Sequence, residues 1–362
     1  MYYFLGFIMF ILFFAANIRY GRHMIQITKS TLTIEKLALL AMFGMFSLIF
    51  AFESVYSNGD MEAYRDSYLS LKELTNETYL DYILDNKDPF FYMLSFFLSK
   101  LGLGFYMWHA LIGLFYSYAL YVLLKRYSPN IYISFIVFIT LGNLGFALSA
   151  LRQMIAIAFV MFAFKYVEER KLIKFVVVTL VACLFHSTAM IFFIAYPLYK
   201  IRLKVKTLVA MAVAMIMLVP VSRTIIAFIL PRIGAHELYY EYLQSDTTLS
   251  ISGTIISVCI LVFCVVFLIK NKNTARYQGL CNFAMVSIFF KLLSVVFFAE
   301  MFRVSLYFSI FDTIMIAEAC SCSDKKDKTL IRIKTLLATL AILAYYFISP
   351  NVNIVNYDML LF

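Results

Sequence analysis

The sequence predicts an all-α protein that crosses a membrane many times, and three observations carry this prediction. Of the 362 residues, 63% are hydrophobic and only 14% are charged. In soluble chains, about 45–50% of the residues are apolar and about 25% are charged. The 38 Phe and 26 Tyr residues add more apolar volume than one aqueous core can bury. The apolar residues form long unbroken runs, whereas strands of a membrane barrel alternate apolar and polar residues. A soluble enzyme, a disordered tail and a disulfide-stapled domain are therefore excluded.

A membrane span needs roughly 20 apolar residues. By this criterion the apolar runs predict about twelve transmembrane helices, although about ten or eleven also fit the sequence. We treat residues 1–362 as a single integral membrane domain. The segment 174–199 is short for two crossings, so it is either one tilted helix or two half-helices broken near His186 and Ser187. The predicted spans are 2–18, 36–52, 104–124, 131–147, 148–165, 174–186, 187–199, 207–221, 253–269, 279–299, 303–319 and 333–349.

Basic residues orient these helices. Six connections hold 22 of the 31 Lys and Arg residues, and the positive-inside rule places such connections in the cytoplasm. Both chain ends and two loops, 53–103 and 222–250, then lie outside. The net charge of +10 is therefore a topology signal, and we expect no nucleic-acid partner. Two of these connections are marked by Lys125 and Arg126 and by Lys165, Arg170, Lys171 and Lys174.

The first external loop begins with an acidic, tyrosine-rich stretch. The helical spacing of Tyr64, Tyr68 and Leu71 predicts a short amphipathic helix on the outer surface. The chain from Pro89 onward is apolar, and we interpret it as an interfacial or re-entrant helix with Pro89 in its first turn. A re-entrant helix must be buried in protein or line a cavity. The stretch is either a solvated connector or a binding surface, and its tyrosines fit an interfacial belt or a sugar-stacking surface.

The second external loop, 222–250, combines arginines with clustered tyrosines. Arg223, Arg232 and Tyr240 are the members that we select as ligand contacts. Arginine beside tyrosine suits a ligand that is part phosphate and part sugar. An interfacial aromatic helix explains the same residues equally well.

Ionisable residues inside predicted spans cost roughly 2.5–3.5 kcal/mol each, so each is a functional candidate by default. The alternative for any one of them is a buried ion pair that holds helices together. Arg152, His186 and Arg303 share the outer half of the membrane with the acidic loop, and converging arginines would clamp phosphate oxygens. No metal-ligand spacing or Gly-rich phosphate loop accompanies them, so a lipid-linked phosphate fits better than a nucleotide. The residues are Arg152, His186, Lys291, Glu300, Arg303, Asp312 and Glu318.

Several short motifs in a fixed order resemble the EpsG family. They are Ser149-Ala150-Leu151-Arg152-Gln153-Met154, Phe185-His186-Ser187-Thr188-Ala189, Arg303-Val304-Ser305-Leu306-Tyr307-Phe308 and the Asp60-x-x-x-Tyr64 element of the first external loop. The resemblance covers about residues 36–320. Its members are bacterial inner-membrane proteins of the Wzy type, which polymerise O-antigen, capsular or exopolysaccharide repeat units.

The resemblance implies a metal-independent membrane glycosyltransferase without a cofactor, similar in fold to multi-spanning lipid-dependent glycosyltransferases. It implies a multi-pass protein of the bacterial inner (cytoplasmic) membrane with its active site facing the periplasm. A growing glycan would move from undecaprenyl pyrophosphate to a hydroxyl of the next lipid-linked repeat unit. The expected partners are the undecaprenyl-pyrophosphate-linked oligosaccharide and membrane lipid, and family analogy adds a chain-length regulator.

The chemistry selects residues for this reaction. Expelling pyrophosphate needs charge stabilisation on its oxygens, for which Arg152 and Arg303 are the first candidates and Arg232 and Arg223 the next. The acceptor hydroxyl needs a base or an orienting acceptor; His186 and Asp60 are the best candidates. His186 has the alternative role of a helix-break residue. The remaining substrate contacts that we expect are Gln153, Tyr64 and Tyr240.

Other functions of a lipid-linked glycan remain open. A flippase or transporter should show an internal repeat and polar residues through the full membrane depth, and neither is evident. An O-antigen ligase would use the same donor and similar arginines but a different acceptor. A membrane acyltransferase would need a histidine site on the cytoplasmic side, where only His23 lies.

Overall fold

The structure is a computed structural model that describes residues 29–57, 59–75, 78–84, 86, 88–202, 251–270, 274–296, 299–321 and scattered positions between 206 and 228. The regular elements in these ranges are all helices, as the all-α prediction requires. The predicted spans 2–18 and 333–349, and most of 207–250, lie outside the described residues. The chain divides into two compact units, 1–190 with 316–362 and 191–315, and the single-domain expectation stays a prediction.

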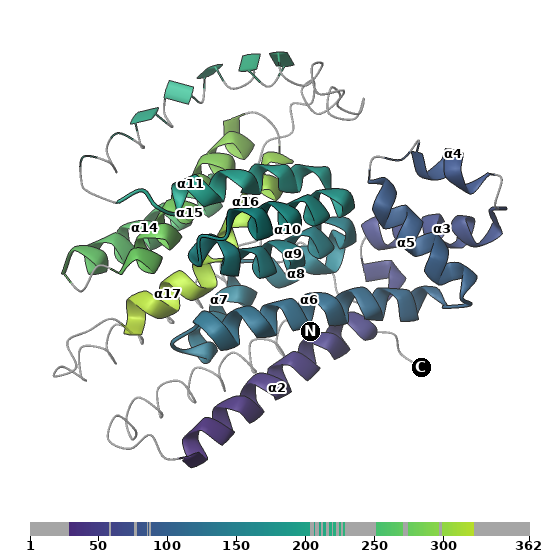
Figure 1. Cartoon of the computed structure of the whole chain (residues 1–362), viewed down its shortest axis with the longest axis horizontal. Coiled ribbons are helices and arrows are strands. Elements are labelled where there is room, and N and C mark those ends of the chain that lie inside the picture. The colour runs from purple at the N-terminus through teal and green to yellow at the C-terminus, as the bar shows by residue number, and fades with distance from the viewer. Residues whose placement is uncertain are drawn as a thin grey trace. The chain divides into compact units, whose positions relative to one another are not determined.

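Helices of the first unit pack side by side (Figure 1). α9 lies between α6 and α10, and α2 lies along α6. Phe159 of α9 links its neighbours, because its ring centroid lies 5.2 Å from that of Phe115 in α6 and 5.5 Å from that of Phe185 in α10. The helices are α2 (Lys29–Ala51), η1 (Val55–Ser57), α3 (Gly59–Glu73), α4 (Tyr79–Leu84), α5 (Pro89–Lys100), α6 (Phe105–Tyr127), α7 (Ile131–Thr140), α8 (Asn143–Ser149), α9 (Leu151–Glu168) and α10 (Leu172–Phe185).

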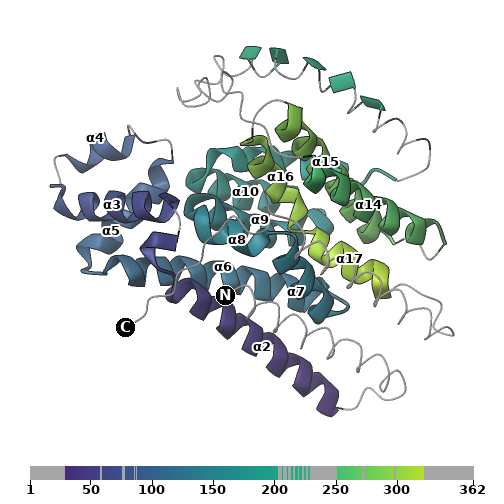
Figure 2. The same cartoon turned by 180° about the vertical axis from the view of Figure 1, so that it is seen from behind.

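Three helices of the first external loop form a subassembly at one end of α6, visible from both sides in Figures 1 and 2. The Tyr79 and Phe96 rings stack 4.5 Å apart at 7°, which joins α4 to α5. Lys100 at the end of α5 donates to the carbonyls of Lys72 and Leu74 at 3.0 and 2.7 Å, and so caps the end of α3. The predicted amphipathic and Pro89-initiated helices both exist, as α3 and α5.

A tight turn folds α10 back along α9. Arg170 adopts the left-handed conformation (φ 57°), and the N–H groups of Arg170 and Lys171 bond the carbonyls of Val167 and Tyr166 at 3.3 and 2.9 Å. This is the Schellman arrangement, which satisfies the last carbonyls of a helix. The turn is short, so α9 and α10 form an antiparallel hairpin.

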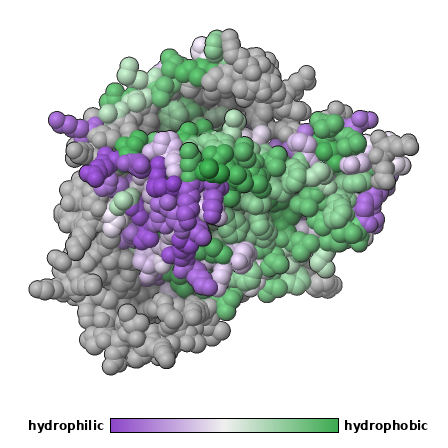
Figure 3. Space-filling model, viewed as in Figure 1, coloured by the Kyte–Doolittle hydropathy of each residue, from purple (hydrophilic) through white to green (hydrophobic). Residues whose placement is uncertain are grey.

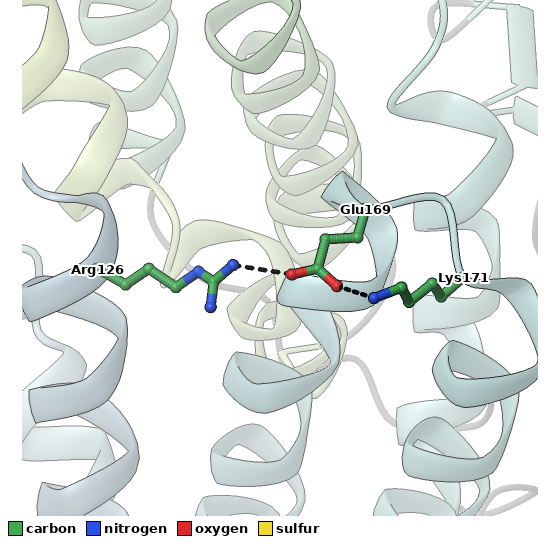
Figure 4. Close-up of polar contacts among 3 residues, drawn as sticks. All are labelled: Arg126, Glu169 and Lys171. Atoms are coloured by element: carbon green, nitrogen blue, oxygen red, sulfur yellow. Dashed lines mark hydrogen bonds and ion pairs between the residues drawn. The ribbon is translucent and has the colours of Figure 1, made fainter.

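Charged residues tie this turn to the end of α6 (Figure 4). Glu169 accepts from Arg126 at 2.9 Å and from Lys171 at 2.8 Å. The Lys171 hydrogen bond, followed by the Lys171, Lys165 and Arg126 contributions, outweighs desolvation and lowers the pKa of Glu169. Two connections that the basic residues predict to lie on one side of the membrane therefore do lie together, while their cytoplasmic assignment stays a prediction.

The predicted span 131–147 and the segment 174–199 are both broken. Residues 131–147 form α7 and α8, which meet at a 58° bend where Gly142 has φ +80°. α10 ends at Phe185, and His186 is extended (φ −157°, ψ 111°) before the 3₁₀ helix η2 (Ser187–Ile194) and α11 (Ala195–Leu198). The break near His186, one of two alternatives from the sequence, is thus the one that forms.

The second unit, 191–315, has its own aromatic core. Phe192, Phe283 and Phe308 pack with ring centroids 5.5–5.9 Å apart. Lys291 donates to Ser257 at 2.7 Å and interacts electrostatically with Asp312, so these charges have buried partners. The main helices are α14 (Ser252–Lys270), α15 (Ala275–Val296) and α16 (Met301–Ser309), followed by α17 (Asp312–Ser321), which runs past the unit boundary.

The described residues contain at least two candidate membrane-spanning helices, which bear out the membrane class of the fold but not the predicted count of about twelve. Among the described residues, Phe105–Tyr127 and Ala275–Val296 are each long and apolar enough to cross, and the bent α7–α8 pair makes a third if it is one span. Shorter apolar helices cover Leu39–Ala51, Leu172–Phe185, Ser187–Leu198 and Ser252–Val265.

Hydrophobic residues also cover a large part of the face that Figure 3 draws, beside a hydrophilic patch. On α10, Ile173, Val177, Leu180 and Leu184 are all exposed and follow one face at helical spacing. Stripes of this kind are unusual on a soluble monomer and are what a lipid-facing helix needs.

Gly113 provides a test of the α2–α6 packing. A Cβ at Gly113 would overlap the buried ring of Phe50, whereas a Cβ at Gly44 would meet nothing within 4 Å. We expect Gly113→Ala to destabilise the protein by about 1–3 kcal/mol through overpacking, and Gly44→Ala to be neutral or slightly stabilising. Thermal unfolding in detergent measures both; equal melting temperatures would contradict this packing.

Candidate functional site

Three ionisable side chains meet where the start of α5, the start of α9 and the end of α10 come together. Asp88 Oδ2 lies 2.9 Å from His186 Nδ1 and 3.1 Å from an Nη of Arg152. Asp88 Oδ1 accepts from the backbone N–H of Ser187 at 3.2 Å. We call Asp88, Arg152 and His186 the charged cluster. It lies at the opposite end of the α9–α10 hairpin from the Glu169 turn.

The local sequence explains why Asp88 is available to this cluster. It occupies the N-cap position of α5 but makes no side-chain capping bond there. Pro89 follows at the first helical position and has no N–H to satisfy. The carboxylate instead caps the start of η2, because the Ser187 N–H is one of the donors that a helix leaves unpaired. A break after α10 is therefore stabilised by a residue that is distant in sequence.

Arg152 is placed for a ligand as well as for Asp88. Its side chain is 26% exposed, whereas those of His186 and Asp88 are 11% and 0% exposed. The Nε of Arg152 is buried and has no hydrogen-bond acceptor among the described residues. An arginine in the first turn of a helix also opposes the helix dipole. These features together leave a cation with one unused donor at the exposed edge of the cluster.

The cluster keeps Asp88 ionised. Burial raises the pKa of the Asp88 carboxyl, but the His186 hydrogen bond, the charges of His186 and Arg152, and the Ser187 N–H outweigh burial and hold the pKa below its ordinary value. A buried carboxylate is tolerated when charge and hydrogen bonds compensate it in this way.

Tyrosines surround the exposed edge. The Tyr64 side chain hydrogen-bonds with Arg152, and the Arg152 guanidinium carbon lies 5.9 Å from the Tyr92 ring centroid. The Tyr82 ring is perpendicular to the Tyr92 ring at 6.0 Å. An aromatic face beside a cationic fork is an environment for a ligand that carries both an apolar ring face and an anion.

The structure brings three of the predicted site residues together. Arg152, His186 and Tyr64 lie together, although they come from three different helical segments. Asp60 is exposed one turn before Tyr64 on α3, and Gln153 is buried in α9. Arg303 is exposed on α16 in the second unit. Arg223, Arg232 and Tyr240 lie outside the described residues.

Sequence reasoning missed Asp88 and Tyr92. In the sequence, Asp88 is one of many acidic residues of the predicted external loop. Apart from the following Pro89, no neighbouring residue distinguishes it from the others. The signal that could have found it is an acidic N-cap at the start of an apolar segment, because a re-entrant segment of this kind carries its first residue toward membrane depth. Tyr92, one turn further along α5, would have followed from Asp88.

A second buried pair lies apart from the cluster's contacts. Glu53 Oε2 is 3.5 Å from His109 Nε2, and both side chains are fully buried. Glu53 thus has a partner of its own. No three His, Cys, Asp or Glu residues in the described part of the chain are grouped closely enough to hold a metal ion.

Comparison with known proteins gives one family. No curated protein and no solved structure matches the chain. The model of the EpsG family matches residues 36–359, which include the charged cluster, the tyrosines around it and both units. Because the match covers most of the sequence, the chain belongs to the EpsG family.

Proposed function

We propose that this protein is a polysaccharide polymerase that extends a glycan carried on undecaprenyl pyrophosphate. Family membership supports a polysaccharide polymerase-type function in general. The observation that carries the finer proposal is the charged cluster, which puts an arginine with an unused donor beside a histidine held by a carboxylate. The donor lipid, the outer location of the site and the residue roles below are parts of this proposal.

The reaction needs two groups that the cluster can supply. A hydroxyl of the acceptor repeat unit attacks the anomeric carbon of the donor glycan. The bond from that carbon to the pyrophosphate oxygen breaks, and the electron pair leaves with undecaprenyl pyrophosphate. Arg152 stabilises the charge that develops on the phosphate oxygens, because its planar fork matches two of them.

His186 takes the proton of the attacking hydroxyl. With Nδ1–H donated to Asp88, the neutral imidazole carries its lone pair on Nε2. General-base assistance of this kind contributes about 10²–10⁴-fold to a rate. Tyr64 and Tyr92 then offer ring faces against which sugar rings of the donor or acceptor can pack.

The arginine fork is tested by substituting lysine. Arg152→Lys keeps the charge and loses the planar fork, so we expect polymer formation to fall by about 100-fold or more. The measurement is the rate of chain extension by the purified protein on lipid-linked repeat units. The matched control is Arg126→Lys, which alters an arginine–carboxylate pair of similar length at the exposed turn; we expect it to stay within about twofold, because such surface pairs contribute little. Equal rates in the two variants would remove Arg152 from the site.

The histidine is tested with a variant that keeps its bond to Asp88. His186→Asn can still donate from Nδ2 to the carboxylate but has no basic nitrogen. We expect at least about a 100-fold loss of chain extension with unchanged thermal stability. Full activity in this variant would mean that His186 only stabilises the helix break. This is the alternative role that the sequence leaves open.

The polymerase is distinguished from a ligase by the products that accumulate without the protein. Deletion of the gene should abolish the series of long glycan chains that a gel resolves as a ladder. A single repeat unit should still reach the surface acceptor, because its attachment needs no polymerisation. The measurement is gel separation of surface glycans. Long chains that persist on undecaprenyl while surface attachment is lost would identify a ligase instead.

A further inference from the structure

We propose that Asp88 is a positioning residue shared between Arg152 and His186, and that a phosphate group arriving at Arg152 takes its place there and leaves the carboxylate to His186. This inference rests on the proposed function and adds a coupling within that site. Binding of the anionic part of the donor and orientation of the base would then be one event.

Sharing follows from which oxygen is used. Arg152 and His186 both contact Oδ2 of Asp88, at 3.1 and 2.9 Å, while the Ser187 N–H contacts Oδ1 at 3.2 Å. Two partners on one oxygen divide its negative charge between them. When one of them leaves, the remaining hydrogen bond becomes stronger, because charge-assisted bonds depend on the charge available.

Burial decides which partner leaves. Asp88 is 0% exposed and is held by His186 and by the start of η2, so its carboxylate stays in place. Arg152 is the more exposed member at 26% and has a long side chain that can turn toward a ligand. A ligand that competes with Asp88 for Arg152 therefore moves the arginine, not the carboxylate.

A phosphate group is the competitor that this arginine fits. It carries several oxygens and can occupy two N–H groups of one guanidinium at once. Once the side chain has turned toward the ligand, its Nε, which has no acceptor among the described residues, supplies the second of these donors. A phosphate thus gains a bond that Asp88 does not make, in a site that already tolerates one negative charge.

The consequence for His186 is orientation. A carboxylate at Nδ1 fixes the tautomer whose Nε2 has the lone pair, and it stabilises the cation that forms when Nε2 takes a proton. Asp88 does both more strongly once Arg152 no longer shares it. Tyr64 and Tyr92 are the other titratable groups that face Arg152.

The test is Asp88→Asn, with inorganic pyrophosphate as the probe of the anion site. Asparagine keeps the shape and an acceptor for Ser187 but removes the competing charge. We expect pyrophosphate to bind about fivefold more tightly than to the wild-type protein in detergent, while chain extension falls by at least about tenfold. If Asp88 has only a structural role, the variant should bind pyrophosphate more weakly than the wild-type protein or equally well. Weaker binding or equal binding would each overturn the proposal.

A second measurement is made on the wild-type protein and does not depend on the folding of Asp88→Asn. In wild-type protein labelled with ¹⁵N-histidine, pyrophosphate should move the Nδ1 resonance of His186, and Arg152→Lys should reduce that movement at least by half. An Nδ1 resonance that ignores saturating pyrophosphate would overturn the proposal. The pyrophosphate affinity and the His186 resonance are both measured without polymer formation, so the coupling could hold even if the glycan-transfer function were wrong.

Discussion

The first unit depends on one buried carboxylate that is satisfied from three directions. Asp88 joins the start of α5, the start of α9 and the break after α10 through an arginine, a histidine and a backbone N–H. A charge so far from water is stable only while its partners remain, because an unpaired buried charge is strongly destabilising. The positions of the three segments are therefore interdependent, and a change in one is transmitted to the other two.

Aromatic packing holds α3, α4 and α5 in the place that this carboxylate requires. Trp108 of α6 donates to Ser95 of α5 at 3.2 Å, and Tyr68 of α3 donates to the Leu103 carbonyl at 3.0 Å. These bonds attach polar edges of large rings to the short segments between α3 and α6. The subassembly has few charges in its interior, so rigid rings fix its geometry. The same packing fixes the positions of Tyr64 and Tyr92 at the edge of the charged cluster.

Sequence reasoning recovered much of the fold because lipid and charge leave strong patterns. Long apolar runs predict the helices, and the Lys125–Arg126 and Lys165–Lys174 connections share one end of the hairpin as the charges require. Arg152, His186 and Tyr64 can be selected from the sequence because charge inside a span is costly and because their motifs resemble the family; their roles stay predictions. Asp88 was not found, since one acid among many in a loop acquires its meaning only from residues that folding brings to it. The bend at Gly142 was also missed, because an apolar run does not show where its helix changes direction.

The tight turn at Arg170 has a consequence for how this family can vary in length. Arg152 lies one residue inside α9, and His186 lies one residue beyond α10, so the turn sets both residues at a common level. Each residue added to one arm would raise its end by about 1.5 Å and rotate it by about 100°. The lengths of α9 and α10 are thus coupled. An insertion in one helix is tolerated only if an insertion in the other restores the relative positions of Arg152 and His186. Related chains should vary freely in their loops and keep the count between these two residues.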